Sequence, residues 1–221
     1  LIRNAHSYPE TDALQKVETA LASLQTTDLP ILQKAHRDWW HNYYPQSFVS
    51  LPDKKMENFY WAQMYKLASA TRIGGGLLDN SGPWQVLTPW PNAWWNLNVQ
   101  LSYWSVYASN RLELGMPLVN AIGSNLNNLI NNVPEAYRKD AAALPVATDF
   151  NLIGETVNIP GTEKKAQVGN LPWICHNLWL QYRFSMDESI LRNTIFPTLR
   201  RAINFYLPFL KEDKQEKLHL Q

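Results

Sequence analysis

The chain has 221 residues, with 20 basic and 19 acidic side chains and a formal net charge of +1. A chain of this length can bury a substantial core and is expected to form one domain or at most two. The balanced charge offers no field for nucleic acid or an anionic membrane, and no apolar run approaches the length of a membrane span. We therefore expect neither a nucleic-acid partner nor a membrane-spanning segment.

The first third of the chain carries three helical patterns. Residues 11–25 place a threonine at a cap position before a series of spaced apolar residues, which predicts an amphipathic helix. Pro30 stands where the first residue of a second helix would be. Asp53 is placed to cap a third helix, whose apolar stripe runs from Met56 to Thr71 and which the glycines of 74–76 end.

The central stretch, Trp84–Leu118, is dense in aromatic and amide side chains. Two prolines, at 89 and 91, hold its first half extended and block a helix there. Asn96, Asn98 and Gln100 then follow at every second position, where a helical pattern begins. The pattern consists of Leu101, Trp104, Ala108 and Leu112. The sequence thus predicts an aromatic loop followed by a buried helix, with amide side chains at the end of the loop and in the first turns of the helix.

Amides and indoles are the groups that a sugar site needs. The C–H face of a sugar ring stacks on an aromatic ring, and sugar hydroxyls pair with neutral groups that both donate and accept hydrogen bonds. Dense polar and aromatic clusters are often binding sites, although the same side chains would also pack and cap a rigid loop, and composition leaves both interpretations open. The candidate sugar-binding residues are Trp84, Trp90, Trp94 and Trp95, with Asn96 and Asn98.

The second half continues with helical patterns. Pro117 begins a helix that would bury Leu118, Ile122, Leu126 and Leu129, and its asparagine-rich side, which includes Asn125, Asn127, Asn128, Asn131 and Asn132, is expected to face solvent. Pro134 begins a further short helix. Residues 145–170 lose the helical period and predict a long loop or hairpin, in which Asp149 or Glu155 could approach a sugar.

The last part of the chain predicts two helices and an exposed end. Residues 171–184 are apolar nearly all round and should form a buried helix, in which the only cysteine, Cys175, is expected to be an inert thiol. Asp187 caps the next segment, Pro197 restarts a helix, and the chain ends in a charged, solvated tail from Lys211. Seven or eight helices with hardly any strand predict the all-α class.

Three segments of the chain resemble the centre of glycoside hydrolase family 95, a family of inverting α-L-fucosidases and relatives. That family reads roughly N-I-N-x-Q-M-N-Y-W, N-L-x-E and P-L, with the same spacing through more than twenty positions. The matching residues here are Trp95–Trp104, Asn110–Glu113 and Pro117–Leu118. The resemblance implies an (α/α)6 toroid built from antiparallel helical hairpins. Residues 1–221 would form a part, the N-terminal half, of that catalytic domain.

The resemblance also implies a chemistry. In the family, two asparagines hold the attacking water and a distant Asp polarises it; the matching residues here are Asn96 and Asn98. The general acid of the family is the Glu of a Ser-Pro-Glu motif, which these 221 residues do not contain. We therefore expect the acid and the polarising Asp to lie beyond Gln221, and the segment alone not to hydrolyse sugars. Glu113 matches the N-L-x-E glutamate, which lies too far along the helix to reach a bond held at Asn96.

The chain departs from the family at three positions. Many relatives have His where this chain has Trp94, and often His near the positions of Asn177 and Gln181. The sequence therefore leaves two substrate classes open: an α-L-fucoside, and an α-L-galactoside or related sugar. The expected partners are an oligosaccharide or glycan substrate and the rest of the same catalytic domain, with no cofactor and no metal, in a secreted or periplasmic protein. The alternative is a non-catalytic helical segment that binds carbohydrate or serves structure.

Overall fold

The computed structural model describes residues 12–24, 28–78, 80, 82, 90, 92–161 and 167–220. The chain divides into two compact units, Leu1–Phe48 and Val49–Gln221. The threonine expected to cap the first helix, Thr11, and the candidate site residue Trp84 lie outside the described residues. Within the described part of the chain, no helix is both long and apolar enough to cross a membrane.

The described part of the first unit contains α1 (Ala13–Ala22) and α2 (Leu29–Tyr43), which continues into a short 3-10 turn, η2 (Tyr44–Gln46). Pro30 lies in the first turn of α2, as predicted. Near the end of α2, Trp39 stacks on Tyr43 with ring centroids 5.1 Å apart, and Trp40 stacks on Tyr44 at 5.5 Å. Both pairs are four residues apart, so they lie on one face of the helix.

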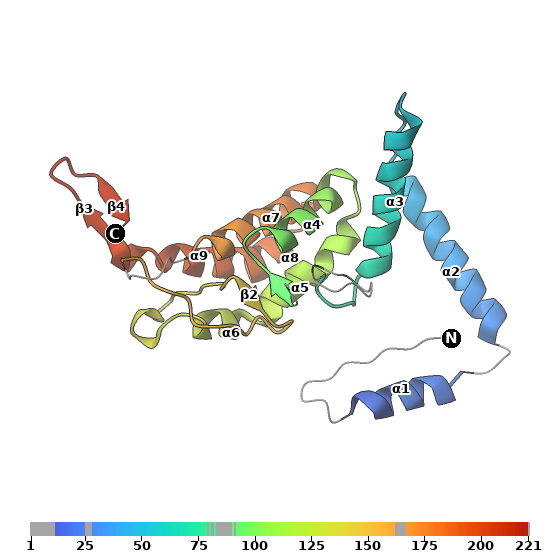
Figure 1. Ribbon diagram of the computed structural model, residues 1–221, viewed down its shortest axis with the longest axis horizontal. Helices are drawn as coiled ribbons and strands as arrows, with labels where there is room; N and C mark the ends of the chain where they lie inside the picture. The colour runs from blue at the N-terminus through green and yellow to red at the C-terminus, as the bar shows by residue number, and fades with distance from the viewer. Residues whose placement is uncertain are drawn as a thin grey trace. The chain divides into compact units, whose positions relative to one another are not determined.

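The second unit is built mainly from helices, which confirms the predicted all-α class (Figure 1). Its described residues also include two small antiparallel pairs of strands: β1 with β2, and β3 with β4. The helical segments are α3 (Lys54–Ala70), α4 (Asn98–Ala108), η3 (Leu112–Gly115), α5 (Met116–Ser124), α6 (Leu126–Asn131), η4 (Glu135–Tyr137), α7 (Asn170–Ser185), α8 (Glu188–Ile190), η5 (Leu191–Ile195), α9 (Phe196–Asn204) and η6 (Leu207–Phe209). The strands are β1 (Ala93–Trp94), β2 (Ala147–Thr148), β3 (Leu210–Glu212) and β4 (Leu218–Leu220).

The predicted starts of three helices are confirmed. The Asp53 carboxylate accepts from the backbone N–H of Lys55 at 2.8 Å, and that of Asp187 accepts from Ser189 at 2.8 Å. Each carboxylate thereby satisfies an N–H group that the first turn of its helix leaves without a partner. Pro117 occupies the first turn of α5, where its missing N–H costs nothing.

Helices α4 and α7 pack against each other at the centre of this unit (Figure 1). Each contributes apolar side chains with almost no exposed surface, among them Val106 of α4 and Leu178 of α7. Helix α7 turns back into α8 through Met186, which adopts the left-handed conformation at φ 55°. The return helix takes a π-helical turn at η5 just before Pro197, whose ring would otherwise clash with the carbonyl of the preceding turn.

Two predicted helices end earlier than their apolar pattern does. The helix expected to reach Leu112 ends at Ala108, and Asn110 takes a left-handed conformation at φ 57°. The helix expected from Pro117 through Leu129 is interrupted at Asn125. In both cases a polar residue that tolerates non-helical backbone overrides the apolar periodicity, which by itself marks no boundary.

The solvated asparagine face was a wrong prediction for Asn128 and Asn132. The Asn132 side chain is buried, and its Nδ2 donates to the carbonyl of Leu152 at 2.9 Å. Asn128 Nδ2 donates to the carbonyl of Asn151 at 2.8 Å. These amides serve as partners for backbone groups of the 149–157 loop, which has no regular ladder of its own beyond one bridge between Thr148 and Gly154.

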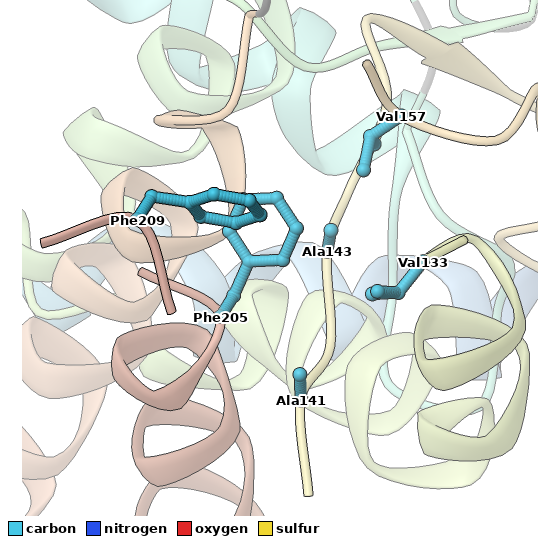
Figure 2. Close-up of a cluster of buried hydrophobic side chains, with 6 residues drawn as sticks. All are labelled: Val133, Ala141, Ala143, Val157, Phe205 and Phe209. Atoms are coloured by element: carbon cyan, nitrogen blue, oxygen red, sulfur yellow. The ribbon is translucent and has the colours of Figure 1, made fainter. Parts of the chain in front are cut away.

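A cluster of apolar side chains fixes the same loop to the end of α9 (Figure 2). Val157 from the loop and Phe205 and Phe209 from the C-terminal side are buried together. The other members, Val133, Ala141 and Ala143, come from the segment that follows α6. This cluster and the Asn132 contacts hold both ends of the 149–157 loop, so that the position of its backbone is fixed.

The charged tail from Lys211 is exposed, as we predicted, and it folds as a β-hairpin. Strand β3 pairs with β4, and the Asp213 carboxylate closes the turn by accepting from the backbone N–H of Gln215 and Lys217. These hydrogen bonds, the one from Lys217 foremost, together with a 2.7 Å contact to His219 Nε2, lower the pKa of Asp213. The charges are exposed, as expected, but they also build the turn.

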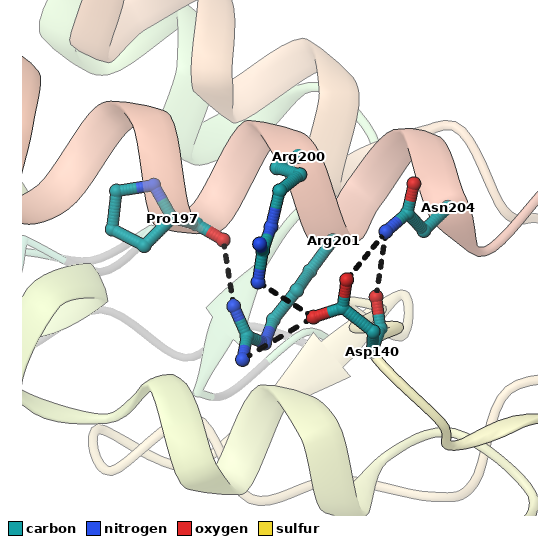
Figure 3. Close-up of polar contacts among 5 residues, drawn as sticks. All are labelled: Asp140, Pro197, Arg200, Arg201 and Asn204. Atoms are coloured by element: carbon teal, nitrogen blue, oxygen red, sulfur yellow. Dashed lines mark hydrogen bonds and ion pairs between the residues drawn. The ribbon is translucent and has the colours of Figure 1, made fainter.

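Asp140 fastens the 138–142 segment to α9 (Figure 3). Its carboxylate lies 2.7 Å from Arg200, 3.4 Å from Arg201 and accepts from Asn204 Nδ2 at 2.8 Å. Asp140 itself adopts a left-handed conformation at φ 51°. Asp and Asn adopt that conformation far more readily than residues with apolar side chains, because their short polar side chains can form local hydrogen bonds.

We expect the Asp140→Ala variant to lower the free energy of unfolding by about 1–3 kcal/mol, because it loses the partly exposed ion pairs and must also adopt left-handed backbone. Asp140→Asn, which removes the charge and keeps the conformational tolerance, should cost less than about 1 kcal/mol. Chemical denaturation followed by circular dichroism measures both. Equal losses in the two variants would contradict a contribution from the backbone conformation.

Candidate functional site

The segment from Ala93 to Asn98 leads from the β1–β2 pair into α4. Strand β1 pairs antiparallel with β2, so that Trp94 lies opposite Ala147. Asn98 is the first residue of α4, and Asn96 lies in the turn just before it. Both amide side chains reach the surface, Asn96 being exposed and Asn98 half-buried. The two predicted water-positioning residues thus stand at the N-terminal end of a helix.

Trp95 anchors this segment to the interior of the unit. It has no exposed surface, and its indole Nε1 donates to the Thr148 hydroxyl at 2.8 Å. Its backbone N–H donates to the carbonyl of Val146 at 2.8 Å, and its carbonyl accepts a hydrogen bond from the Gln100 side chain. These contacts fix the backbone on either side of Trp95, where Trp94 and Asn96 reach the surface. Trp95 therefore holds the loop and presents no face to a ligand.

Asn177 extends this anchoring to α7. It is fully buried, and its Nδ2 donates to the backbone carbonyl of Gln100 at 2.9 Å. Its amide also lies beside the buried hydroxyl of Tyr107, whose pKa is raised, chiefly by desolvation. A chain of hydrogen bonds thus connects α7 through Gln100 to the carbonyl of Trp95. Asn177 is one of the positions where we expected a departure from the family, and it lies in this buried interface.

Gln181 has a similar place one turn further along α7. It is almost fully buried, and its Nε2 donates to the carbonyl of Leu112 at 2.9 Å. Gly115 passes directly against the Gln181 side chain, where a β-carbon would overlap the amide oxygen. Gln181 therefore secures the turn after α4. Its environment is a packed helix interface and includes none of those predicted sugar-binding residues that the structure describes.

Trp90 and Trp94 form the aromatic part of the surface. Their ring centroids are 6.4 Å apart and the ring planes are inclined at 73°. Trp90 keeps 54% of its surface exposed, and its carbonyl accepts from Asn80 Nδ2 at 3.3 Å. Trp94 is half-buried, so each indole keeps part of its surface accessible. The structure thus brings together Trp90 and Trp94, while Trp95 points into the interior.

A first hollow of about 300 Å³ lies on the face of α4 that begins at Asn98. Ser102 and Ser105, four and seven residues after Asn98, line it and share that helix face. Across from them stand Gln63 and Lys66 of α3, and Asn80 connects the hollow to Trp90. We call this the α3–α4 hollow.

A second hollow of about 380 Å³ lies beside Trp94. One wall consists of Trp94 and the 145–147 segment, and the other is formed by residues 155–158 of the fixed loop. Its polar side chains are Glu155, Thr156, Asn158 and Gln167. We call this the Trp94 hollow. Asp149, the other acidic candidate of this loop, accepts hydrogen bonds from Asn151 and Ile153 and so caps a turn of the loop itself.

Sequence reasoning identified this second hollow only in part. Glu155 was one of two acidic candidates in a predicted loop, and Asn158 and Gln167 were not singled out. A signal was present at Gly154, since a glycine inside an extended segment often marks close approach of another backbone. Its β-carbon would lie 2.6 Å from the carbonyl oxygen of Ala147.

Cys175 takes no part in the surface site. It is buried in α7, and burial raises the pKa of its thiol to about 12, so it stays protonated at neutral pH. A protonated, inaccessible thiol is a poor nucleophile. The predicted burial of this cysteine is confirmed.

A helical unit that presents paired indoles and amides beside two hollows has the make-up of a carbohydrate-active protein. The chain matches the glycosyl hydrolase family 95 catalytic domain over residues 6–221 and belongs to that family. It is 26% identical over 155 residues to alpha-L-fucosidase 2 of Arabidopsis thaliana, which covers 68% of this chain. It is also 25% identical over 126 residues, 55% of this chain, to a probable alpha-fucosidase A of Aspergillus niger. The matched stretches make up 18% and 15% of the lengths of these two relatives.

Proposed function

We propose that the protein is an inverting glycoside hydrolase that acts on an α-linked sugar, an α-L-fucoside or a related α-L-galactoside. The observation that carries this proposal is the placement of Asn96 and Asn98 at the surface, on a segment that is held rigid through Trp95 and bordered by the exposed indole of Trp90 and the half-buried indole of Trp94. Membership of glycosyl hydrolase family 95 supports the reaction class. The fucosidase names of the two relatives support the sugar.

The asparagines supply position and not basicity. Inversion requires a water molecule held on the face of the sugar opposite the leaving group. An amide oxygen is a weak base, so its contribution is to orient and polarise that water in a fixed geometry. Trp95 accepts a hydrogen bond from the Gln100 side chain and donates one to the Thr148 hydroxyl. These bonds lie directly next to Asn96 in the chain, and they supply the rigidity that such orientation needs.

The general acid that the resemblance implies, the Glu of a Ser-Pro-Glu motif, has no counterpart among the 221 residues. Glu113 lies in η3, past the far end of α4 from Asn98. The eleven residues of α4 alone span roughly 16 Å, too far for one carboxyl group to bridge.

The chain contributes part of an (α/α)6 toroid and packs against the rest of the same catalytic domain. The outer face of α4 supports this architecture, because Leu97, Leu101 and Trp104 stand at helical spacing and are between 44% and 47% exposed. A stripe of this kind on a helix normally faces another helix. We expected Leu101 and Trp104 to be buried, and further helices of the domain would cover them.

The test is a substrate panel on the intact full-length protein. Aryl α-L-fucoside, α-L-galactoside and, as comparison, β-linked aryl glycosides are assayed, and the anomer first released is identified by proton NMR. We expect turnover of at least one of the two α-L-glycosides, with release of the β-anomer. Release of the α-anomer, or hydrolysis of the β-linked substrates alone, would refute the proposal.

A further inference from the structure

We propose that the Trp94 hollow is a subsite for a second sugar unit, next to the one whose bond is cleaved, and that Glu155 determines which unit it accepts. This inference rests on the proposed glycosidase function and adds a part of the substrate to it. The substrate class it names is an oligosaccharide that carries the reactive sugar on a pyranose unit with neighbouring free hydroxyls.

Residues 155–158, the wall of the hollow that carries Glu155, are held in place by contacts within the protein. The backbone of Gly154 approaches so closely that a β-carbon there would lie 2.6 Å from both the Ala147 carbonyl oxygen and Pro145 Cγ. Gly154 bridges to Thr148, and its N–H donates to Asn132 Oδ1 at 3.4 Å. These contacts join the residue before Glu155 to strand β2, which pairs with Trp94 on the opposite wall.

The other side of Glu155 is fixed as well. The N–H of Val157 donates to the backbone carbonyl of Asn132 at 2.8 Å, and the Val157 side chain is buried in the cluster with Phe205 (Figure 2). Asn132 thus contacts the loop on both sides of Glu155. A polar group on a wall fixed in this way loses little conformational freedom when it binds a ligand.

The side chains of the hollow are those that hold a sugar ring. Trp94 offers an aromatic surface for the C–H face of a pyranose, and the Glu155 carboxylate accepts from hydroxyls. The amides of Asn158 and Gln167 both donate and accept. A volume of about 380 Å³ lies within the range of small-molecule sites, which begins at roughly 300 Å³.

The hollow is next to the reactive position and separate from it. Neither Asn96 nor Asn98 is among the described residues that line it, whereas Trp94, two residues before Asn96, forms its border. A sugar stacked on Trp94 would therefore adjoin a sugar bound at the asparagines. Glu155 would contact the neighbouring unit, which a simple aryl glycoside lacks.

The experiment compares two substrates of the full-length protein: an aryl α-L-fucoside and a neutral trisaccharide with a terminal α-L-fucose. Glu155→Gln keeps the shape and removes the charge. It should lower the ratio of kcat/KM for the trisaccharide to that for the aryl substrate by about tenfold or more, the effect of losing a charge-assisted hydrogen bond. Glu135→Gln, an exposed glutamate on η4, serves as the control and should keep the wild-type ratio.

An unchanged ratio in Glu155→Gln would overturn the proposal, and so would an equal loss on both substrates, because Glu155 would then act on the reactive sugar. If the wild-type protein hydrolyses neither substrate, its action on α-L-fucosides is refuted separately, and the aryl α-L-galactoside of the substrate panel decides on the glycosidase assignment. Calorimetric titration with the same trisaccharide then decides on the subsite. Binding that is at least about tenfold weaker in Glu155→Gln than in the wild type supports it, and equal binding or none refutes it.

Discussion

Replacing Asn96 or Asn98 with alanine in the intact protein should lower kcat by at least about 10²-fold, which is the usual cost of removing one preorganised polar group from a transition state. Each amide reaches the surface on a segment whose backbone is fixed at Trp95 by hydrogen bonds from the Gln100 side chain and to Thr148. Because an amide contributes orientation, the loss should appear in kcat more than in KM. Steady-state kinetics on an aryl α-L-glycoside measure both constants.

A matched control is Asn127→Ala, which removes an exposed amide on α6 and should leave kcat at the wild-type value. Thermal unfolding of each variant checks that the protein is folded, which matters most for Asn98 at the start of α4. Near-wild-type turnover in both Asn96→Ala and Asn98→Ala would show that the amides serve only the structure of the loop. That result would favour the non-catalytic interpretation of this segment.

Local chemistry made the starts of the helices predictable. Asp53 and Asp187 cap their helices through hydrogen bonds that span two residues, and Pro30 and Pro117 lie in first turns. Interactions of this range are contained in a short window of sequence. The all-α class follows in the same way, because it depends on the period of the apolar residues and not on which helices meet.

Burial depended on partners distant in the sequence, and the sequence pattern was a poorer guide to it. Asn132 was expected in solvent, yet it is buried because its amide pairs with the backbone of Leu152, twenty residues on. Trp104 continues an apolar stripe but stays 45% exposed within these residues. Helical periodicity identifies a face; it does not specify which loop or helix covers that face.

The residues of the site also divide into those that a local sequence pattern identifies and those that contacts between distant residues bring together. The paired indoles and amides of Trp90–Asn98 lie close together in the chain, so sequence reasoning could propose them as a group. The Trp94 hollow brings Trp94 together with Glu155, and the connection passes through the close approach of Gly154 to Ala147. Likewise, the contact between Trp95 and Thr148 spans 53 residues. No local pattern distinguishes a tryptophan that faces a ligand from its buried neighbour.

That difference between neighbours leads to the second large expected effect. Trp95→Ala should lower the free energy of unfolding by about 3–5 kcal/mol, because it removes a fully buried indole and leaves a cavity. Trp94→Ala, one residue away and half-buried, should cost clearly less stability and act mainly on sugar binding. Urea denaturation of both variants, with binding of a fucosylated oligosaccharide measured below the transition, separates the two roles.

The indole hydrogen bond can be isolated within the Trp95 effect. Trp95→Phe keeps most of the buried ring and loses the bond from Nε1 to the Thr148 hydroxyl, and Thr148→Val removes the same bond from the other side. Thr148→Val also removes a bond from that hydroxyl to the carbonyl of Asp149, so the double variant is needed. Because the two single variants share one lost bond, their combined cost should be smaller than the sum of their separate costs by about 1 kcal/mol. Strict additivity would show that the bond from Trp95 to Thr148 contributes nothing to the anchoring of the loop beneath Asn96.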